Sequence, residues 1–186
     1  MESGKFQNFQ FHWDQSKIHD RTRFSKEEQS GLVLSNENKT VKRKERFQGD
    51  DYPSIRILGD KSIESAIGND KTNFHIEWKI KINQSHGFIE IGIMNPAQQH
   101  TFLLKSFKDE VQIEKEGNLE TIKFGETFTV NDVITVRIEG NQDGSTMTLH
   151  YLKNDVYVGA PFKDIPIASF YPMVGLNDND DEITLN

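Results

Sequence analysis

The sequence feature that most constrains the fold is an alternation of apolar and polar residues between Phe74 and Ile82. Large apolar residues occupy every second position, with charged or polar residues between them: Phe74, Ile76, Trp78, Ile80 and Ile82 alternate with His75, Glu77, Lys79 and Lys81. A period of two is typical of a strand with one buried face, because successive side chains of a strand point to opposite faces. We therefore expect a half-buried β-strand here.

Similar short segments, separated by turn residues, recur along most of the chain. We expect strands at Gly31–Ser35, Lys39–Lys42, Phe88–Ile93, Thr101–Leu104, Glu110–Glu114, Asp132–Glu139, Thr146–Leu152, Val156–Val158 and Ile183–Leu185. Phe88–Ile93 is apolar on both faces, which predicts a central position in a sheet. Asp143-Gly144 and Lys153–Asp155 favour tight turns, since Gly, Asn and Asp accept a positive φ. Many short strands with such turns predict an all-β fold, an antiparallel β-sandwich.

The composition excludes several classes of protein. The 186 residues suffice for one domain, and the absence of Cys excludes disulfides and Cys-based zinc sites. The chain has 22 Lys and Arg against 29 Asp and Glu, a net charge of −7 that disfavours nucleic acid and anionic membranes as partners. No apolar run approaches the ~20 residues of a membrane helix, and Met1–Trp13 has no signal-peptide core. We expect an intracellular, cytoplasmic protein.

The sequence shows no recognisable catalytic motif. It has no Cys nucleophile, no Gly-x-Ser-x-Gly motif and no glycine-rich phosphate loop. No two His residues have a metal-binding helix spacing, and His75 and His150 fall on solvent-facing positions of expected strands. The acidic run Asn177–Glu182 begins like an EF-hand loop but lacks the Gly at its sixth position. We therefore expect a protein that is not an enzyme and that needs no cofactor or metal.

The C-terminal half resembles a SPRY/B30.2 domain. The densest similarity covers Asp132–Ile138, Asp143–Asn154, Val158–Ile165 and Phe170–Leu176. Upstream, Phe74–Ile80 resembles the family's His-x-Trp-Glu strand, so that the resemblance extends over about residues 30–186. The sequence departs from the family pattern at Asn154-Asp155, Pro161 and Gly175. The resemblance implies a concanavalin-like sandwich over residues 31–186, and we expect Tyr171-Pro172 to start an edge strand, where a missing amide donor does no harm.

SPRY domains are mostly protein-interaction modules that bind a peptide or loop through loops at one end of the sandwich. The resemblance therefore implies a non-catalytic module, a subunit or adaptor of a larger intracellular assembly. In the SOCS-box group of the family, the pocket uses an Arg, a Tyr and a Trp. The Arg aligns with Arg43, whereas the Tyr position falls near His100 and the Trp position near Asp178. The location of the site can therefore carry over, but the peptide specificity of that group does not.

We expect loops 43–53, 95–101 and 177–181 to form this site. Asp178 and Asp180 would make its rim acidic, which predicts a partner protein with a polar or basic segment. Phe47 and Tyr52 would be exposed aromatic anchors, and the alternative is that they pack under their own loop. The basic segment Lys39–Arg46 is either a solvated strand end or a patch for acidic peptides or phosphate.

We expect residues 1–30 to be an N-terminal arm, in which four aromatic residues recur at uneven spacing: Phe6, Phe9, Phe11 and Trp13. They either close the edge of the sandwich, which we favour, or dock into a groove of a partner. The oligomeric state stays open. The alternative function is a carbohydrate-binding, lectin-like sandwich, for which the sequence lacks a secretory signal and a good calcium cage.

Overall fold

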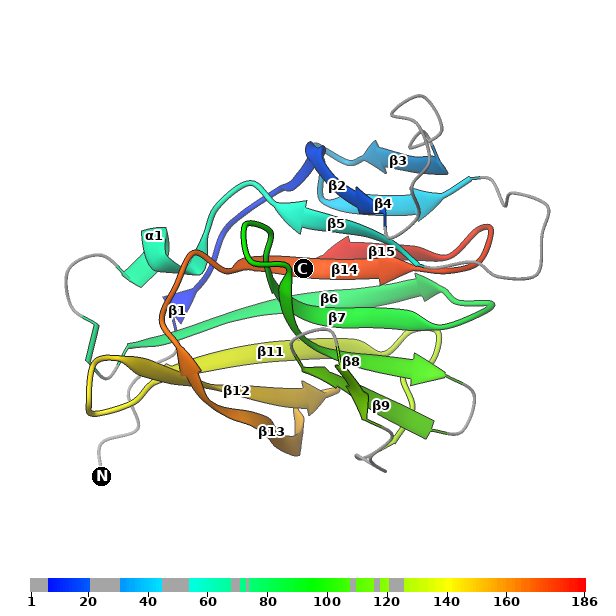
Figure 1. The fold of residues 1–186 in the computed structure, drawn as a ribbon. Helices are drawn as coiled ribbons and strands as arrows, with labels where there is room; N and C mark the ends of the chain where they lie inside the picture. Colours follow the sequence, from blue (N-terminus) through cyan, green and yellow to red (C-terminus); the bar gives the residue numbers. More distant parts are fainter. Residues whose placement is uncertain are drawn as a thin grey trace.

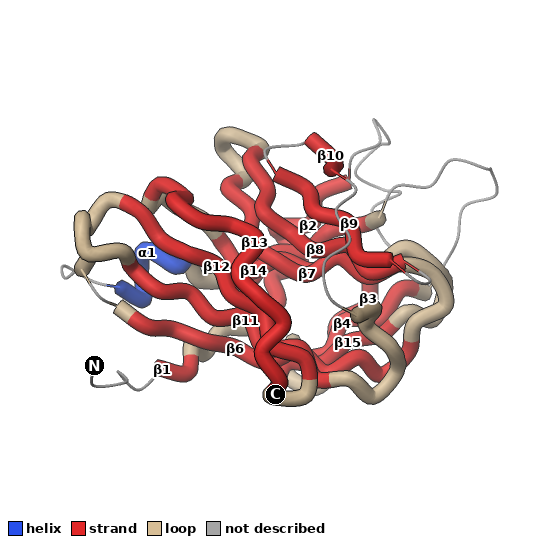
Figure 2. The backbone as a smooth tube through the Cα atoms, turned by 90° about the horizontal axis from the view of Figure 1, so that it is seen from below, coloured by secondary structure: helices blue, strands red, loops and turns tan. Residues whose placement is uncertain are grey.

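The computed structural model describes residues 7–20, 31–44, 54–67, 71–72, 74–107, 110–115, 118–120 and 126–186. Within these residues the chain forms two β-sheets that face each other as two layers (Figures 1 and 2). Their strands pair in an antiparallel manner, except β1, which pairs parallel to β6. The expected all-β, antiparallel sandwich is confirmed. The short helix α1, Ile63–Ile67, lies at one end of the sandwich (Figure 1).

The first sheet, sheet A, has the strand order β13-β12-β11-β6-β15-β4-β3, with β1 also beside β6. Its strands are β1 (Gln7–Asn8), β3 (Leu32–Ser35), β4 (Thr40–Arg43), β6 (His75–Gln84), β11 (Val133–Gly140), β12 (Thr146–Lys153), β13 (Val156–Pro166) and β15 (Glu182–Leu185). The second sheet, sheet B, has the order β10-β9-β8-β7-β14-β5-β2. Its strands are β2 (Trp13–Asp20), β5 (Ile55–Gly59), β7 (Ile89–Asn95), β8 (His100–Phe107), β9 (Glu110–Lys115), β10 (Asn118–Glu120) and β14 (Tyr171–Leu176).

The core lies between the two sheets and follows the alternation of the sequence. The apolar residues of β6 from Ile76 to Ile82 are buried, and the polar residues between them are half-buried, as expected. Every residue of β7 is buried, and β7 lies in the middle of sheet B, which confirms its expected central position. Burial of one large aliphatic or aromatic side chain contributes roughly 1.5–3 kcal/mol, so this core is the main source of stability.

The described part of the N-terminal arm is built into the sandwich. Phe9, Phe11 and Trp13 are buried, and the rings of Phe9 and Phe11 lie 6.2 and 6.1 Å from the ring of Trp78. After them, β2 forms the edge of sheet B beside β5. These three aromatic side chains are therefore part of the core between the sheets.

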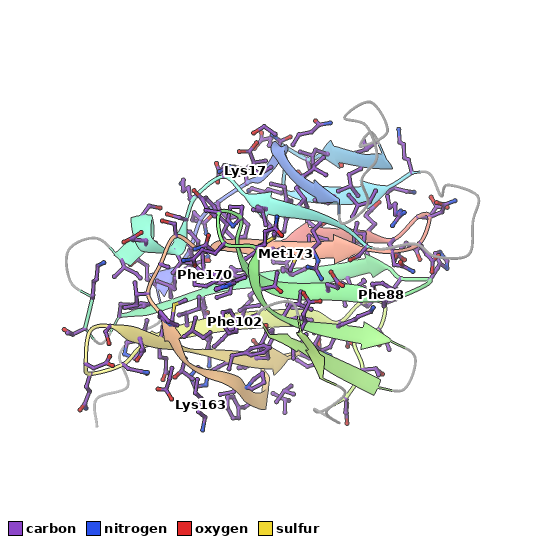
Figure 3. All side chains as sticks on the ribbon, in the orientation of Figure 1. Lys17, Phe88, Phe102, Lys163, Phe170 and Met173 are labelled. Atoms are coloured by element: carbon purple, nitrogen blue, oxygen red, sulfur yellow. The ribbon has the colours of Figure 1, made fainter. Side chains whose placement is uncertain are left out.

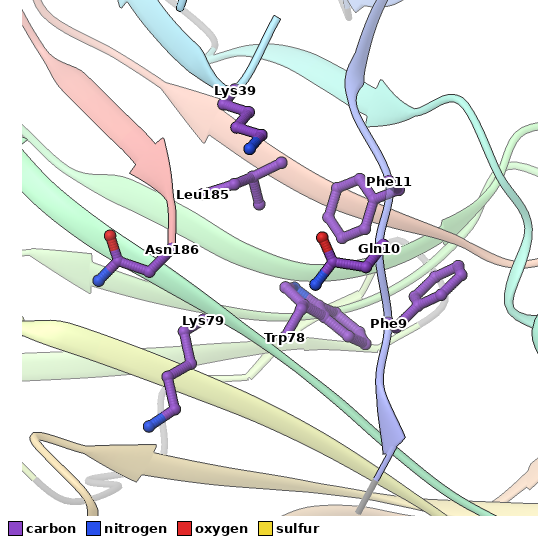
Figure 4. Close-up of a pocket in the computed structure, with 8 residues that line it drawn as sticks. All are labelled: Phe9, Gln10, Phe11, Lys39, Trp78, Lys79, Leu185 and Asn186. Atoms are coloured by element: carbon purple, nitrogen blue, oxygen red, sulfur yellow. The ribbon is translucent and has the colours of Figure 1, made fainter. Parts of the chain in front are cut away.

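A small hollow remains beside Trp78 (Figure 4). It lies beside β6, between two backbone hydrogen bonds to that strand. The amide of Asn186, after β15, donates to the carbonyl oxygen of Lys79, and the amide of Phe9 donates to the carbonyl oxygen of Glu77. The volume of the hollow is about 30 Å³. That is the volume of about one water molecule, so the hollow is too small for an organic ligand.

The strand register defines two opposite ends of the sandwich. Leu176, at the end of β14, pairs with Ile89 at the start of β7, whereas Tyr171 pairs with Met94. Loops 85–88 and 177–181 and the end of β4 therefore lie at one end, here called the Asp181 end. The β7–β8 turn, residues 96–99, lies at the other end, here called the Gln99 end (Figure 1). The length of β7 separates the two ends by about 20 Å.

The structure corrects one expectation about strand position. β14 is not an edge strand, because it lies between β7 and β5. Pro172 is tolerated there because its pairing is one-sided: it lies opposite Ile93 of β7, while the pairing with β5 begins only at Met173. Strands β1, β2, β5 and β10 and helix α1 were not expected from the sequence.

Candidate interaction surface

Arg43 is the one position at which the sequence matched the pocket residues of the SOCS-box group, and its side chain is buried at the Asp181 end. Its side chain is only 1% exposed, and Nη1 donates to the carbonyl oxygen of Leu176 (2.8 Å). The backbone of Arg43 also makes two hydrogen bonds, donating to the carbonyl oxygen of Asp181 (2.9 Å) and accepting from the amide of Asp180 (2.8 Å). Arg43 thus holds loop 177–181 against β4. A direct contact with a partner would require this side chain to leave its buried position.

Asp181 fixes the same loop from the other side. Its buried carboxylate accepts hydrogen bonds from the backbone amides of His86 (2.7 Å), Asp178 (2.8 Å) and Asn177 (3.2 Å). Burial raises the pKa of Asp181, while the three amide donors oppose the rise. One side chain therefore ties loop 177–181 to loop 85–88, and the backbone conformation of the loop is set before any partner arrives.

Asp178 and Asp180 lie together at this end, as expected. Asp180 is exposed, has a positive φ of 66°, and forms an ion pair with Lys42 (2.8 Å). The hydrogen bond from Lys42 lowers the pKa of Asp180 and raises that of Lys42. Asp178 is half-buried and packs so closely on Gly87 that a Cβ at position 87 would collide with its carboxylate. The surface is therefore of mixed charge, with Lys42 beside the acidic residues, and not purely acidic.

His100 does not belong to this surface, which corrects the grouping of the three loops. It pairs with Asn95 across the β7–β8 turn and lies at the Gln99 end, about 20 Å from the Asp181 end. In that turn, the Asn95 side chain accepts hydrogen bonds from the amides of Ala97 (3.1 Å) and Gln98 (3.2 Å). Phe47 and Tyr52, the expected aromatic anchors, lie outside the described residues.

A buried charged triad lies just inside the Asp181 end, and the sequence did not reveal it. Arg56 of β5 donates to Glu90 of β7 (2.6 Å) and, through both terminal nitrogens, to Glu114 of β9 (3.2 and 3.0 Å). Ser54 donates to Glu90 (2.7 Å) and Thr101 donates to Glu114 (2.6 Å). All five side chains are buried.

The triad fixes the position of Ser54, the residue directly after segment 45–53, which lies outside the described residues. That segment starts after Lys44, next to the buried Arg43, and ends before Ser54, which is fixed on Glu90. Gly175 makes room for the triad, since a Cβ there would lie 2.5 Å from Glu90 Oε2. The two attachment points of the segment are therefore both held by buried polar contacts.

Among the described residues, no three His, Cys, Asp or Glu side chains are grouped so that they could hold a metal ion. In the same part of the chain, no helix is long and apolar enough to cross a membrane.

The fold is similar to that of several solved structures. The SPRY domain of human HERC1 has 14% sequence identity and a TM-score of 0.63, with 93% of this chain and 96% of that chain covered. The TRIM65 PSpry domain has 11% identity and a TM-score of 0.61, with coverage of 96% and 93%. Stonustoxin gives 11% identity and a TM-score of 0.61 over 96% of this chain, which spans 29% of the toxin chain. No protein-family model and no curated protein matches the sequence. On this structural similarity, the chain is a β-sandwich with the SPRY-type fold.

Proposed function

We propose that this chain is a non-catalytic protein-interaction module that recognises a segment of a partner protein at the Asp181 end. It acts as a subunit or adaptor of a larger intracellular assembly. The observation that carries the proposal is the double fixation of loop 177–181, by Arg43 on one side and by Asp181 on the other. A loop that is held in one conformation loses little entropy on binding, so its exposed groups can contribute fully to affinity.

The charges of this end favour a polar or basic partner segment. Asp178 and Asp180 are acceptors for Lys, Arg or backbone amide donors, and Lys42 sets the position of the Asp180 carboxylate. Phe47 and Tyr52 belong to the segment that starts here, and we propose them as the aromatic anchors. His100 is left out of the site because of its position at the Gln99 end.

A matched pair of variants tests the proposal. Asp180 and Glu64 are both surface carboxylates that pair with a Lys (2.8 and 3.3 Å), but Glu64 lies on helix α1, away from the Asp181 end. A partner recovered from an extract of the native source by chemical crosslinking should bind Asp180→Asn about 3- to 10-fold more weakly than the wild type. Its affinity for Glu64→Gln should stay unchanged.

Two results would contradict the proposal. Equal affinities of the partner for both variants would place its contact elsewhere on the molecule. Specific binding to a glycan array, without any protein partner, would favour the carbohydrate-binding alternative. A lectin of this kind should also gain thermal stability when the glycan is added, because the ligand binds only the folded state.

A further inference from the structure

The outer edge of β13 is the second surface of interest. β13 is the last strand of sheet A, and among the described residues no strand pairs with it on the side away from β12 (Figure 1). An open edge offers backbone donors and acceptors to an added strand. Pro161 and Pro166 lack an amide donor, which protects the C-terminal part of β13. Val156–Ala160 is therefore the part of the edge that can accept a partner strand.

Two apolar side chains are exposed on this segment. Val156 is 69% and Tyr157 is 59% exposed, more than any other large hydrophobic residue of the described part. They border a hollow of about 440 Å³ that is lined by Glu126, Lys153, Asn154, Val156, Tyr157 and Val158. This volume is large enough to take a side chain of a bound protein segment, and the exposed side chains of Val156 and Tyr157 favour an apolar or aromatic one.

The neighbouring side chain of His150, on β12, holds the side chain of Tyr157 in place. Its hydroxyl group lies 3.2 Å from His150 Nδ1, and His150 Nε2 lies 3.3 Å from the Glu139 carboxylate. The rings of Tyr157 and His150 lie 6.0 Å apart. A fixed, exposed Tyr is a typical interface hot spot, because it supplies contact area at low entropic cost.

The charge around the hollow is negative. The side chains of Glu126 and Asp155 are 86% and 74% exposed. Two ammonium groups offset them only in part. Lys79 pairs with Asp155 (2.8 Å), and Lys153 is shared between Glu126 (3.5 Å), Asp132 (3.2 Å) and the carbonyl oxygen of Thr127 (2.8 Å), so that three carboxylates face two cations. A cationic side chain of a partner would be complementary to this rim.

We propose that the β13 edge is a second docking surface, separate from the Asp181 end, that binds an extended segment of a partner protein by strand addition. The segment pairs with Val156–Ala160, places an apolar or aromatic side chain in the hollow beside Tyr157, and places a Lys or Arg side chain against Glu126 and Asp155. Strand addition supplies affinity through the backbone, and the hollow and the acidic rim supply specificity.

The test uses random twelve-residue peptides displayed on phage and selected on the full chain. The enriched peptides should carry Lys or Arg next to apolar residues. One enriched peptide, synthesised as the probe, should bind Tyr157→Ala at least about 10-fold more weakly and Asp155→Asn about 3- to 10-fold more weakly than the wild type. Val130→Ala, at an exposed hydrophobic residue outside the hollow, should leave the affinity unchanged.

Hydrogen exchange provides the second readout, because a bound strand should protect the amides of residues 156–160. Thermal melts of each variant control for folding, and little change is expected at such exposed positions. The proposal is overturned if the probe binds Tyr157→Ala as well as it binds the wild type, or if Asp155→Asn does not weaken its binding. It is also overturned if sedimentation shows that the edge pairs two copies of this chain and that Tyr157→Ala dissociates them.

Discussion

The charged triad allows the most specific stability prediction. Arg56→Met keeps the length of the side chain but removes the guanidinium, which donates three hydrogen bonds to Glu90 and Glu114. The variant leaves the two buried carboxylates of sheet B without the guanidinium. Ser54 and Thr101 each still donate one hydroxyl hydrogen bond, so the carboxylates keep part of their compensation.

The structure sets the magnitude of this loss. Three hydrogen bonds to charged groups, at about 1.5–3 kcal/mol each, give an upper range of roughly 5–9 kcal/mol. Removal of one partner of a buried ion pair typically costs about 3–5 kcal/mol, and the remaining hydroxyl donors favour this lower range. We expect Arg56→Met to lower the free energy of unfolding by about 3–5 kcal/mol at pH 7, measured by equilibrium denaturation in urea.

A neutral triple variant is the control. Arg56→Met/Glu90→Gln/Glu114→Gln keeps the shape of the triad and removes all three charges, and such replacements are often close to neutral. We expect the triple variant to be more stable than Arg56→Met alone. The reasoning is refuted if Arg56→Met costs less than about 1 kcal/mol, or if the triple variant is less stable than the single one.

Three further predictions concern Asp181, Gly175 of β14 and Phe11 of the N-terminal arm. Burial raises the folded-state pKa of Asp181 above its unfolded value of about 3.9, so the contribution of this group to stability is lost as the pH rises. The stability of Asp181→Asn relative to the wild type should therefore increase between pH 4 and pH 7 in thermal melts, and a pH-independent difference would contradict this. Gly175→Ala should cost about 1–3 kcal/mol in urea denaturation because its Cβ would meet Glu90, and an unchanged midpoint would contradict the close approach. Phe11→Ala should cost about 3–5 kcal/mol in the same assay, and a cost under 0.5 kcal/mol, a small surface effect, would show that the ring is not part of the core.

Strands with one buried face could be predicted from the sequence, and strands buried on both faces only in part. The alternation between Phe74 and Ile82 predicted β6 to within two residues, since one face of that strand meets the core and the other is partly solvated. β5 was missed because Ile55–Gly59 is buried at every position, so it shows no alternation. Arg56 also had the appearance of a surface residue, because the acidic residues that compensate its charge lie on β7 and β9, far along the chain.

The site was predictable only where neighbouring residues in the sequence also meet in space. Asp178 and Asp180 lie in one loop, and their common position at the Asp181 end follows directly. His100 was assigned to the same end by alignment with a family motif. The alignment does not show that β7 crosses the whole sandwich between loop 85–88 and the β7–β8 turn. The burial of Arg43 could not be predicted either, because its hydrogen-bond acceptor is the backbone carbonyl oxygen of Leu176, on the opposite sheet.

Site-specific photo-crosslinking tests the central claim, that a partner protein binds the Asp181 end. A photoreactive amino acid is placed at Asn179, in loop 177–181, and in a second variant at Ala97, in the turn at the Gln99 end; both positions are exposed. Each variant is irradiated in an extract of the native source, and the products are identified by mass spectrometry. We expect one partner protein to crosslink through position 179 and not through position 97. A partner that crosslinks only through position 97, or equally through both positions, would contradict the account.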